Sequence, residues 1–454
     1  MATIATAIRS TDGQLSAEGL VHRPRIVVIG SGHAGLEACK ALSGEDVDVL
    51  MVDRNNYHKF QPLLYQVATS GLQTGHICMP VRHIFQQQDN FDFRLATVLG
   101  VDLETQLVHV EEGPPIHYDS LIVGAGASVA YYGVEGAEEH GFPLKNVADA
   151  VELRAHVLRC FEEANRNPAL IEGGVLNFVI VGGGPTGVEM AGGLRELFDQ
   201  VLRKDFPGLD LNRVRVILLE RADALMLPYK ADLQAYTKDA LEYIGVDVRL
   251  ETAVTEVTPT EVRLADGTAI PTQTLIWAAG VRANPLADVL SETEGIEQTR
   301  GGRLVTDEYL RLPAHPNVFV AGDIAGAADP QGVLYPQVAQ VAIQQGIQAA
   351  GNAIRAHRGL DPEAFVYNDL GMMATIGRNR AILELPNGTG MKGFIAWCAW
   401  VFVHVVKLAG FRNQLAVFFS WVYSYFTWDR TPRLIIDVEP ETDEIQEPVL
   451  PVSA

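Results

Sequence analysis

Two triplets of glycine residues, each followed at the end of the next strand by an acidic residue, are the features of this sequence that most directly predict chemistry. Each triplet has the spacing Gly-x-Gly-x-x-Gly. In such a turn the first glycine allows a tight bend, the second lets a pyrophosphate reach backbone N–H groups at a helix N-terminus, and the third allows close helix packing. The acid can accept hydrogen bonds from ribose hydroxyls. The two sets are Gly30, Gly32 and Gly35 with Asp53, and Gly182, Gly184 and Gly187 with Glu220.

Each triplet lies between an apolar strand and a helix. The first occurs in RIVVIGSGHAGLEACKAL, which begins at Arg25, and the second in NFVIVGGGPTGVEMAGGL, which begins at Asn177. The strands VDVLMVD and RVRVILLE then end in the two acids. Two strand–turn–helix units of this kind predict an α/β fold with two Rossmann-like domains, each binding one dinucleotide.

Three further apolar strands end in small residues or in an acid. HYDSLIVGAGA and QTLIWAAGV resemble strands that lead the chain past a bound dinucleotide. VTDEYLRLPAHPNVFVAGDIA ends in a Gly-Asp pair, whose carboxylate could accept hydrogen bonds from the hydroxyls of a ribityl chain. The residues that these three strands add to the candidate sites are Ala125, Gly126, Ala279, Gly280, Gly322 and Asp323.

Charge and cysteine content exclude several classes of protein. The formal net charge of −21 repels phosphate backbones, so we expect no nucleic-acid partner. The four cysteines form no CxxC motif, and the histidines show no metal-ligand spacing, so we expect no metal site. Residues 1–22 lack the apolar core of a secretory signal and are expected to form a flexible N-terminus.

The segment 394–428 predicts where the protein is located. Its two apolar runs are too short to span a bilayer, which needs about 18–20 residues, so we expect two short amphipathic helices that lie on a membrane. Cations near this segment outnumber the single acid Asp429 and give a local charge of +4, which favours anionic lipid. The rings expected at the headgroup boundary are those of Trp397, Trp400, Trp421, Tyr423, Tyr425 and Trp428, and the cations are Lys392, Lys407, Arg412, Arg430 and Arg433.

The same segment has an alternative use as a surface for homodimerisation, and the two uses are compatible. The residues that follow, DVEPETDEIQEPVLPVSA, are acidic and contain proline, which is typical of a solvated tail.

Taken in order, these segments resemble the glutathione-reductase-like flavoproteins, in which FAD occupies the first glycine turn and NAD(P)H the second. The closer resemblance is to the type II NADH dehydrogenases, which are single-subunit NADH:quinone oxidoreductases. It extends over about residues 25–433 and is carried by NYHKFQPLLYQVATSGL (56–72), GGGPTGVEMAG (182–192) and QVAQVAIQQG (337–346). The last stretch matches the family's AQxAxQQ quinone-site signature.

The resemblance implies that NADH reduces FAD and that two electrons then pass to a membrane quinone, menaquinone or ubiquinone, without proton pumping. It also implies a peripheral protein on the cytoplasmic face of the cell membrane, with the lipid bilayer surface as a partner. The expected domains are a FAD-binding domain in two parts (23–150 and 289–368), an NADH-binding domain (151–288), a membrane-anchoring region (369–433) and an acidic tail (434–454).

The resemblance also assigns residues to each ligand. Those expected at FAD are Gly30, Gly32, His33, Ala34, Gly35, Asp53, Arg54, Lys59, Val98, Ala125, Gly126, Gly322, Asp323, Ala339 and Gln340. Those expected at NADH are Gly182, Gly184, Pro185, Thr186, Gly187, Glu189, Glu220, Ala279 and Gly280.

The expected catalytic residues are Glu189, Gln340 and Gln344. The positive end of the helix that starts near Gln340 would stabilise reduced flavin, and Gln340 and Gln344, one turn apart, could present amides to the quinone. Glu189 lies in an apolar, glycine-rich setting, where a carboxylate would either tune the field at the helix N-terminus or handle protons.

Two other functions stay open at this point. A sulfide:quinone oxidoreductase would share the fold but needs a cysteine pair beside the flavin, for which only Cys78 and Cys160 are candidates. A non-catalytic flavin redox sensor could bind a membrane through the same aromatic segment, but it would not need the paired glutamines. The intact second glycine turn favours the NADH-dependent enzyme.

Overall fold

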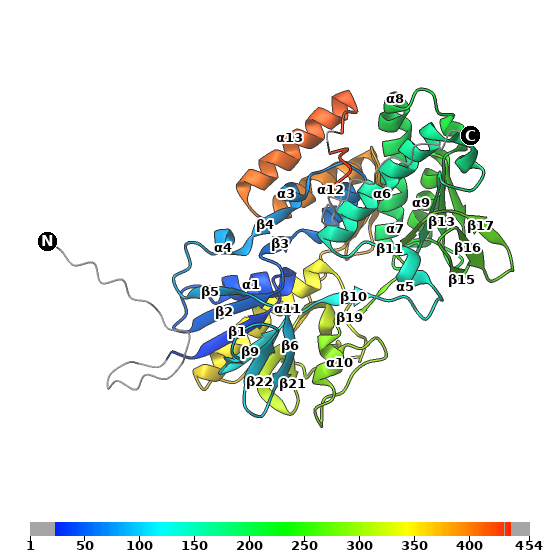
Figure 1. Cartoon of the computed structure of the whole chain (residues 1–454). Coiled ribbons are helices and arrows are strands. Elements are labelled where there is room, and N and C mark those ends of the chain that lie inside the picture. Colours follow the sequence, from blue (N-terminus) through cyan, green and yellow to red (C-terminus); the bar gives the residue numbers. More distant parts are fainter. Residues whose placement is uncertain (1–22, 431, 437–454) are drawn as a thin grey trace, which may run out of the picture.

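Two β-sheets form the centre of the computed structural model, which describes residues 23–430 and 432–436 (Figure 1). The first sheet has the strand order β21-β22-β9-β1-β2-β5, and all its pairs are parallel except β21 with β22. Its strands are β1 (Arg25–Ile29), β2 (Asp48–Asp53), β5 (Phe91–Leu95), β9 (Ser120–Val123), β21 (Arg311–Leu312) and β22 (His315–Val320). The expected flexible N-terminus (1–22) and residues 437–454 of the expected tail lie outside the described residues.

The second sheet is parallel throughout, with the strand order β11-β18-β12-β13-β14. Its strands are β11 (Gly141–Pro143), β12 (Asn177–Val181), β13 (Arg215–Leu219), β14 (Val246–Arg249) and β18 (Thr274–Trp277). Strand β11 falls within residues 23–150, which the sequence assigns to the FAD-binding domain, yet it pairs with β18 of the second sheet. A strand of only three residues, such as β11, has too short a hydrophobic pattern for the sequence to show which sheet it joins.

Continuous burial of apolar side chains explains why these segments form parallel strands. In β1 and in β12 the last four residues are all buried, as expected for strands that are covered on both faces. Helices α1 (His33–Ala41) and α11 (Ala339–His357) pack together beside the first sheet. Helices α7 (Pro185–Glu196) and α9 (Ala231–Tyr243) contact strands of the second. Helix α6 (Val147–Arg166) begins with a capping box formed by Asn146 and Asp149.

Two short strands connect the sheets. Strand β10 (Ala127–Val129) follows β9, strand β19 (Val281–Ala283) follows β18, and the two pair antiparallel. In Figure 1 this pair lies between the two sheets. The two Ala-Gly segments precede this connection, and their expected position beside a bound dinucleotide stays a prediction.

Smaller elements complete these two units. Two three-stranded antiparallel sheets are β6 (Val98–Asp102), β7 (Leu107–Val110) and β8 (Ile116–His117), and β15 (Val254–Val257), β16 (Glu261–Leu264) and β17 (Ala269–Pro271). The short strand pairs are β3 (Tyr57–Lys59) with β4 (Cys78–Pro80), and β20 (Leu304–Val305) with β23 (Ala325–Gly326). The short helices are α2 (Leu64–Ala68), α3 (Thr74–Ile77), α4 (Val81–Ile84), α5 (Ala137–His140), α8 (Arg203–Asp205) and α10 (Leu286–Leu290).

The C-terminal region is a small antiparallel sheet followed by two helices. Strands β24 (Met372–Gly377), β25 (Arg380–Glu384) and β26 (Gly390–Gly393) lead into α12 (Phe394–Lys407) and α13 (Phe411–Thr427). The two helices match the expectation from the sequence, whereas the sheet was not predicted. Within the described residues, neither of these helices, nor any other, has the length and apolarity needed to cross a membrane.

The aromatic side chains of α12 and α13 are arranged differently from the prediction. Trp400, expected at a headgroup boundary, is 2% exposed, and Trp397 and Trp421 pack against the same core. Phe411 and Phe426 are 74% and 77% exposed. Both faces of α12 are apolar, so the sequence shows an aromatic segment without showing which rings face inward. The exposed apolar side chains are Phe394, Ile395, Phe402, Val406, Phe411, Leu415, Phe418, Phe419, Val422, Tyr423 and Phe426.

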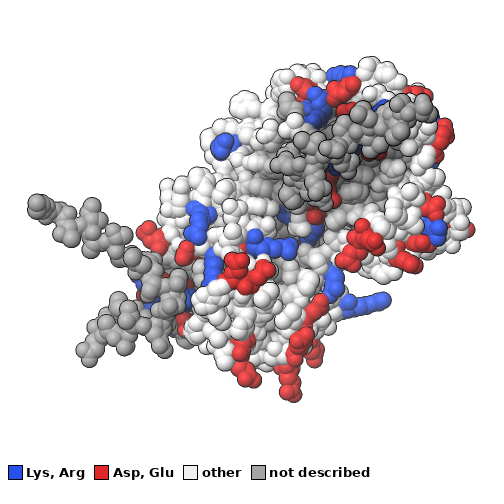
Figure 2. Space-filling view, in the orientation of Figure 1, with Lys and Arg blue, Asp and Glu red and all other residues white. Residues whose placement is uncertain are grey.

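Two of the five expected lipid-facing cations form ion pairs with acids distant in the sequence, and Lys392 lies over the Tyr236 ring. Arg430 forms an ion pair of 2.6 Å with Glu196, and Arg433 pairs with Asp205 at 3.3 Å. These acids lie more than 200 residues earlier in the sequence, so a local charge count could not include them. Lys407 and Arg412 are exposed, and Figure 2 shows mostly uncharged surface over α13.

Candidate active site

The first glycine turn, between β1 and α1, has no space for a side chain at two of its three glycines. A Cβ atom on Gly30, whose φ is +100°, would lie 2.4 Å from the carbonyl oxygen of Gly124. One on Gly35 would lie 1.8 Å from the carbonyl oxygen of Gly30. One on Gly32 would meet nothing within 4 Å. This open side, at the N-terminus of α1, suits the approach of a pyrophosphate.

The second glycine turn, between β12 and α7, repeats this arrangement. A Cβ atom on Gly182, whose φ is +113°, would lie 2.5 Å from the carbonyl oxygen of Ala278. One on Gly187 would lie 1.9 Å from the carbonyl oxygen of Gly182, and one on Gly184 would meet nothing within 4 Å. Pro185 occupies the first turn of α7, where a missing N–H leaves no helical hydrogen bond unmade.

The two strand-end acids hold these turns in place. The Asp53 carboxylate accepts hydrogen bonds from the backbone N–H of Ser31 at 2.6 Å and from its hydroxyl at 3.0 Å. The Glu220 carboxylate accepts from the backbone N–H groups of Gly183 at 2.6 Å and Ala222 at 2.8 Å. Both acids therefore lie beside the glycine turns, as the spacing predicts.

The residues around the first turn fit a bound dinucleotide. Nε2 of His33 is buried without a hydrogen-bond partner, at the start of α1 and next to the open side of Gly32. Burial lowers the pKa of His33 to about 3, so the ring is neutral near pH 7 and can accept or donate a hydrogen bond. The His58 ring lies edge-on to it at 5.2 Å. A ligand with polar atoms, such as the expected FAD, would supply the missing partner.

A second group of expected FAD residues is joined by contacts between distant segments. Lys59 Nζ donates to the carbonyl oxygen of Lys145, and Lys145 Nζ lies 3.7 Å from the Asp323 carboxylate. Burial lowers the pKa of Lys59 to about 8. The backbone N–H of Gly322 donates to Oε1 of the buried Gln345 at 2.7 Å. Lys145 was missed from the sequence because it belongs to no motif and is recognisable only by its spatial neighbours.

The remaining expected residues lie at the ends of secondary-structure elements. Arg54 is exposed after β2, Val98 begins β6, and Ala339 begins α11. Ala34 is buried in α1, whereas Pro185 and Thr186 are exposed at the start of α7. Ala125 and Gly126 precede β10, and Ala279 and Gly280 precede β19.

Gln340 and Gln344 have backbone partners that the sequence did not indicate. Gln340 Nε2 donates to the carbonyl oxygen of Gly371 at 2.9 Å, and its Oε1 accepts from the N–H of Leu370 at 3.1 Å. Gln344 makes the same pair of bonds with Asn368, both at 2.9 Å. The two amides thus fix the segment that leads from α11 to β24. Their expected contact with a quinone stays a prediction.

Glu189 lies in the first half of α7, against the C-terminal region. Its Oε1 accepts a long hydrogen bond, 3.4 Å, from the backbone N–H of Thr375 in β24. Burial raises the pKa of Glu189 to about 8, because few polar groups stabilise the ionised form. The side chain is therefore mostly a neutral acid near pH 7 and can gain or lose a proton close to that pH.

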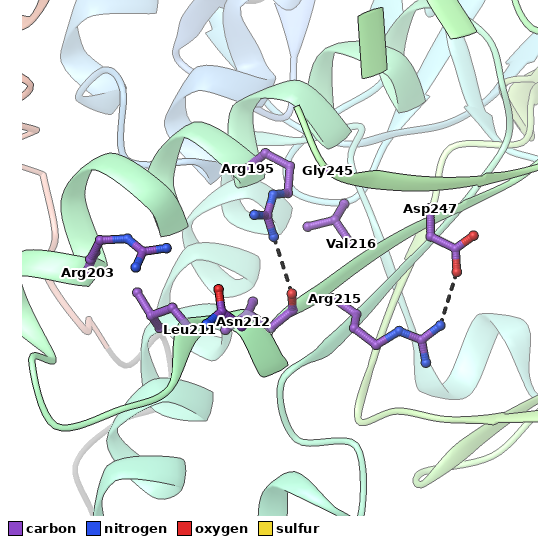
Figure 3. A pocket seen from close by; sticks show the side chains of 9 residues that line it. Arg195, Arg203, Leu211, Asn212, Arg215, Val216, Gly245 and Asp247 are labelled. Atoms are coloured by element: carbon purple, nitrogen blue, oxygen red, sulfur yellow. Dashed lines mark hydrogen bonds and ion pairs between the residues drawn. The ribbon is translucent and has the colours of Figure 1, made fainter. Parts of the chain in front are cut away.

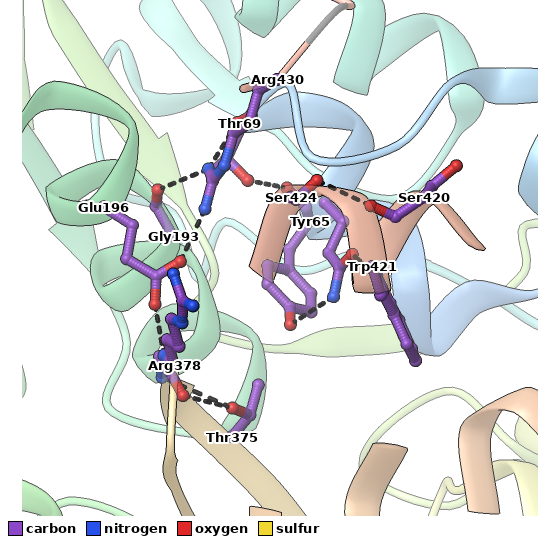
Figure 4. Close-up of polar contacts among 12 residues, drawn as sticks. Tyr65, Thr69, Gly193, Glu196, Thr375, Arg378, Ser420, Trp421, Ser424 and Arg430 are labelled. Atoms are coloured by element: carbon purple, nitrogen blue, oxygen red, sulfur yellow. Dashed lines mark hydrogen bonds and ion pairs between the residues drawn. The ribbon is translucent and has the colours of Figure 1, made fainter. Parts of the chain in front are cut away.

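A pocket of about 110 Å³ lies between α2, β24, α12 and α13 and includes Thr375, the backbone partner of Glu189. Its lining includes a polar clamp (Figure 4), in which Arg430 donates to the carbonyl oxygen of Thr69 at 2.9 Å and pairs with Glu196 at 2.6 Å. The Arg378 guanidinium lies 3.8 Å from the ring centres of Tyr425 and Trp428. Sequence reasoning missed this clamp, although Glu196 is two helical turns after Glu189 on the same helix. The aromatic side chains that line the pocket are Tyr65, Trp397, Trp400, Trp421, Tyr425 and Trp428.

The cysteines and histidines suggest no additional chemistry. All four cysteines are free thiols, and Cys78 and Cys160 lie in separate elements, β4 and α6. Burial raises the pKa of both thiols, to about 11 for Cys78 and about 12 for Cys160, which makes them poor nucleophiles. Among the residues that the structure describes, no group of three or more His, Cys, Asp or Glu side chains could hold a metal ion.

The family models match nearly the whole described chain. The model of the pyridine nucleotide-disulphide oxidoreductases covers residues 24–346, and the model of the NDH2 C-terminal domain covers residues 370–428. The first includes both glycine turns, and the second includes β24, β25, β26 and both C-terminal helices.

Comparisons with individual proteins agree with these models. The type II NADH:quinone oxidoreductase Ndh of Mycobacterium tuberculosis is 38% identical over 430 residues, which cover 91% of each chain. The structure of NDH2 from Plasmodium falciparum in complex with NADH is 18% identical, with a TM-score of 0.83 over 92% of this chain and 100% of that one. The sulfide:quinone oxidoreductase of Aquifex aeolicus is 16% identical, with a TM-score of 0.66 over 91% and 93% of the two chains.

The last two likenesses concern the fold alone, whereas the first also concerns the sequence. Taken together, the family models and these comparisons confirm the predicted α/β fold with its two dinucleotide-binding domains, FAD as the flavin of the family, and the enzyme class. The chain belongs to the pyridine nucleotide-disulphide oxidoreductases and, among them, to the type II NADH:quinone oxidoreductases.

Proposed function

We propose that this chain oxidises NADH with FAD bound at its first glycine turn and NADH at its second, and that it reduces a membrane quinone near Glu189. The observation that carries the proposal is the position of Glu189, on the helix that begins at the second glycine turn and hydrogen-bonded to Thr375, which lines the aromatic pocket beneath α12 and α13. FAD, when bound, supplies the capacity to accept two electrons from a nicotinamide and to release them to a quinone.

The two turns orient the dinucleotides. The open sides of Gly32 and Gly184 receive the pyrophosphates, and the neutral His33 ring supplies a polar contact beside the first of them. Asp323 and Lys59, joined through Lys145, hold the sugar-alcohol and flavin portions of FAD. The proposal extends to the full sets of residues that the sequence assigns to FAD and to NADH.

Glu189 holds and moves a proton at its carboxyl oxygens. Quinone reduction consumes two protons, and a neutral acid whose pKa is about 8 can donate one at neutral pH and be protonated again from solvent. Gln340 and Gln344 fix residues 368–371 through backbone hydrogen bonds. These residues lead into β24, which contains Thr375, the hydrogen-bond partner of Glu189. The aromatic lining of the pocket suits a flat, apolar quinone ring.

The exposed face of α12 and α13 binds the surface of a lipid bilayer. Phenylalanine side chains dominate this face, and the exposed cations Lys407 and Arg412 lie at its edge, where they favour anionic headgroups. In a living cell we place this face on the cytoplasmic side of the cell membrane, with menaquinone or ubiquinone as the acceptor. A homodimer through the same face is the alternative use.

Rapid mixing tests this function. In a stopped-flow instrument, NADH should bleach the flavin absorbance, and a second mix with a short-chain quinone should restore it, with both steps fast enough to support turnover. A protein that is reduced by NADH but not reoxidised by quinone would be a sensor, and one that ignores NADH but is reduced by sulfide would belong to the other quinone-reducing class.

The location has its own test. Serine at Phe402, Phe411 and Phe419 should abolish sedimentation with anionic liposomes, because these exposed side chains are the proposed contact with lipid. Oxidation of NADH by a soluble dye should persist, since none of the three packs in the core. As a matched control, Leu227→Ser and Tyr243→Ser, on the exposed surface of the second unit, should leave sedimentation unchanged.

A further inference from the structure

A second pocket lies on the outer side of the NADH-binding unit, away from the glycine turn. It has a volume of about 300 Å³ and is lined by residues of α7, α8, β13 and β14 and the loops beside them (Figure 3). Arg215 is the first residue of β13, and Asp247 is the second residue of β14. The second glycine turn follows the C-terminal end of β12, whereas Arg215 and Asp247 lie near the N-terminal ends of β13 and β14, which run parallel to β12. This pocket therefore lies at the opposite end of the strands from the proposed NADH site.

Arginine side chains dominate the charge of this pocket. Arg195, Arg203 and Arg215 line it, together with one acid, Asp247. Asp247 is shared, because it pairs with Arg215 at 3.1 Å and with Arg249 at 2.9 Å. The lining therefore attracts anions, although the whole chain carries a net charge of −21.

A second shared acid leaves further positive charge uncompensated. Asp199 pairs with Arg195 at 2.8 Å and lies 3.7 Å from Arg203. Four arginines, the three in the lining and Arg249, thus share two acids, Asp199 and Asp247. The side chains of Arg203 and Arg215 are 54% and 46% exposed, so both can bind a further partner.

The C-terminal end of the described chain lies beside this pocket. Arg433 pairs with Asp205 at 3.3 Å, and Asp205 is two residues after Arg203 in α8. The last described residue, Ile436, is three residues beyond Arg433. Since an extended chain spans roughly 3.3–3.6 Å per residue, the eighteen residues 437–454 are long enough to reach the pocket.

The residues that follow have the complementary charge. Between 437 and 447 the sequence contains six acids, Asp437, Glu439, Glu441, Asp443, Glu444 and Glu447, and residues 437–454 contain no lysine or arginine. We propose that this acidic segment of the same chain binds the arginine pocket and fastens the C-terminal helices to the NADH-binding unit. Attachment to the chain raises the local concentration of the segment, so weak individual ion pairs suffice. The proposal does not depend on the residue roles assigned above.

The occupancy of the pocket can be measured with a labelled peptide. The receptor is the full-length FAD-loaded chain in which the six acids are replaced by the matching amides, so that its own segment no longer competes. A fluorescein-labelled peptide of residues 437–454 should bind this receptor, and raised salt should weaken the binding. The unmodified full-length chain should bind the peptide at least about tenfold more weakly, because its own segment occupies the pocket.

Matched variants identify the arginines. Adding Arg203→Glu and Arg215→Glu to the amide-substituted chain should weaken peptide binding by about tenfold or more, since two ion pairs become two repulsions. Adding Arg263→Glu, another half-exposed arginine of the same unit, should leave peptide binding unchanged. Equal binding by the amide-substituted and unmodified chains, or no effect of the Arg203 and Arg215 changes, would overturn the proposal.

Discussion

The two glycine turns have nearly the same internal geometry but very different surroundings. The acid-to-turn hydrogen bonds of Asp53 and Glu220 are both 2.6 Å long. Around the first turn, α11 crosses α1 so closely that a Cβ atom on Gly346 would lie 2.2 Å from the carbonyl oxygen of Ala34. At the second turn, the corresponding start of α7 is exposed at Pro185 and Thr186.

This difference distinguishes a cofactor that stays bound from one that exchanges. A dinucleotide at the first turn would lie beside α11, Asp323 and the Lys59–Lys145 contact, and its release would need several packed segments to separate. A dinucleotide at the second turn meets an open helix start. The contrast supports FAD at the first turn and NADH at the second, as the resemblance implies.

The largest expected effect comes from separating α11 from α1. Gly346→Ala places a methyl group against backbone, so one helix must move, and overpacking of this kind costs about 1–3 kcal/mol or more. We expect the variant to lose FAD on gel filtration and to unfold at a lower temperature. Gly351→Ala is the control on the same helix, because its Cβ would meet nothing within 4 Å. It should keep FAD and gain slightly in stability.

The next effect concerns the choice of nucleotide at the second turn. The Glu220 carboxylate repels a 2′-phosphate, whereas the adjacent exposed Arg221 could attract one. We therefore expect a strong preference for NADH over NADPH, and Glu220→Gln should reduce that preference by about 5- to 150-fold in kcat/KM. Asp53→Asn should not change it, because Asp53 serves the other turn. Equal kcat/KM values for both nucleotides in the unmodified enzyme would contradict the assignment of Glu220.

The sequence predicted the parts of the site that depend on local pattern. Both turns and both acids follow from glycine spacing and apolar strands within short windows, and the start of α11 near Gln340 follows from the resemblance of QVAQVAIQQG to a family motif. The partners of Gln340 and Arg430 could not be predicted, because they lie in segments distant in sequence and the pairing depends on how α11 and α13 pack. Trp400 shows the same limit, since residue type suggested a membrane boundary while packing buried the ring.

A smaller expected effect is a pH dependence of stability and of quinone reduction that comes from Glu189 and not from the residues that only bind nucleotide. Its pKa is raised from 4.5 to about 8, so the folded protein favours the neutral acid, and its contribution to stability is lost as pH rises from about 4.5 through about 8. Glu189→Gln should therefore melt above the unmodified protein at pH 9 but not at pH 4. Reoxidation by quinone should slow above about pH 8 in the unmodified enzyme only. The same inflection in the variant would assign proton handling to another group.

The assignment of FAD to the first turn and NADH to the second is tested most directly by placing a side chain at the open glycine of each turn. Gly32 and Gly184 have φ values of −68° and −78°, which any residue can adopt, and a Cβ at either would meet nothing within 4 Å of the protein. Valine at each therefore obstructs the dinucleotide without straining the fold.

We predict that Gly32→Val yields a folded protein without flavin. Gly184→Val should retain FAD, react slowly with NADH in the stopped-flow instrument, and be reoxidised by quinone at the unmodified rate after reduction with dithionite. Loss of FAD from Gly184→Val, or retained FAD with impaired NADH reduction in Gly32→Val, would contradict the assignment of the two turns.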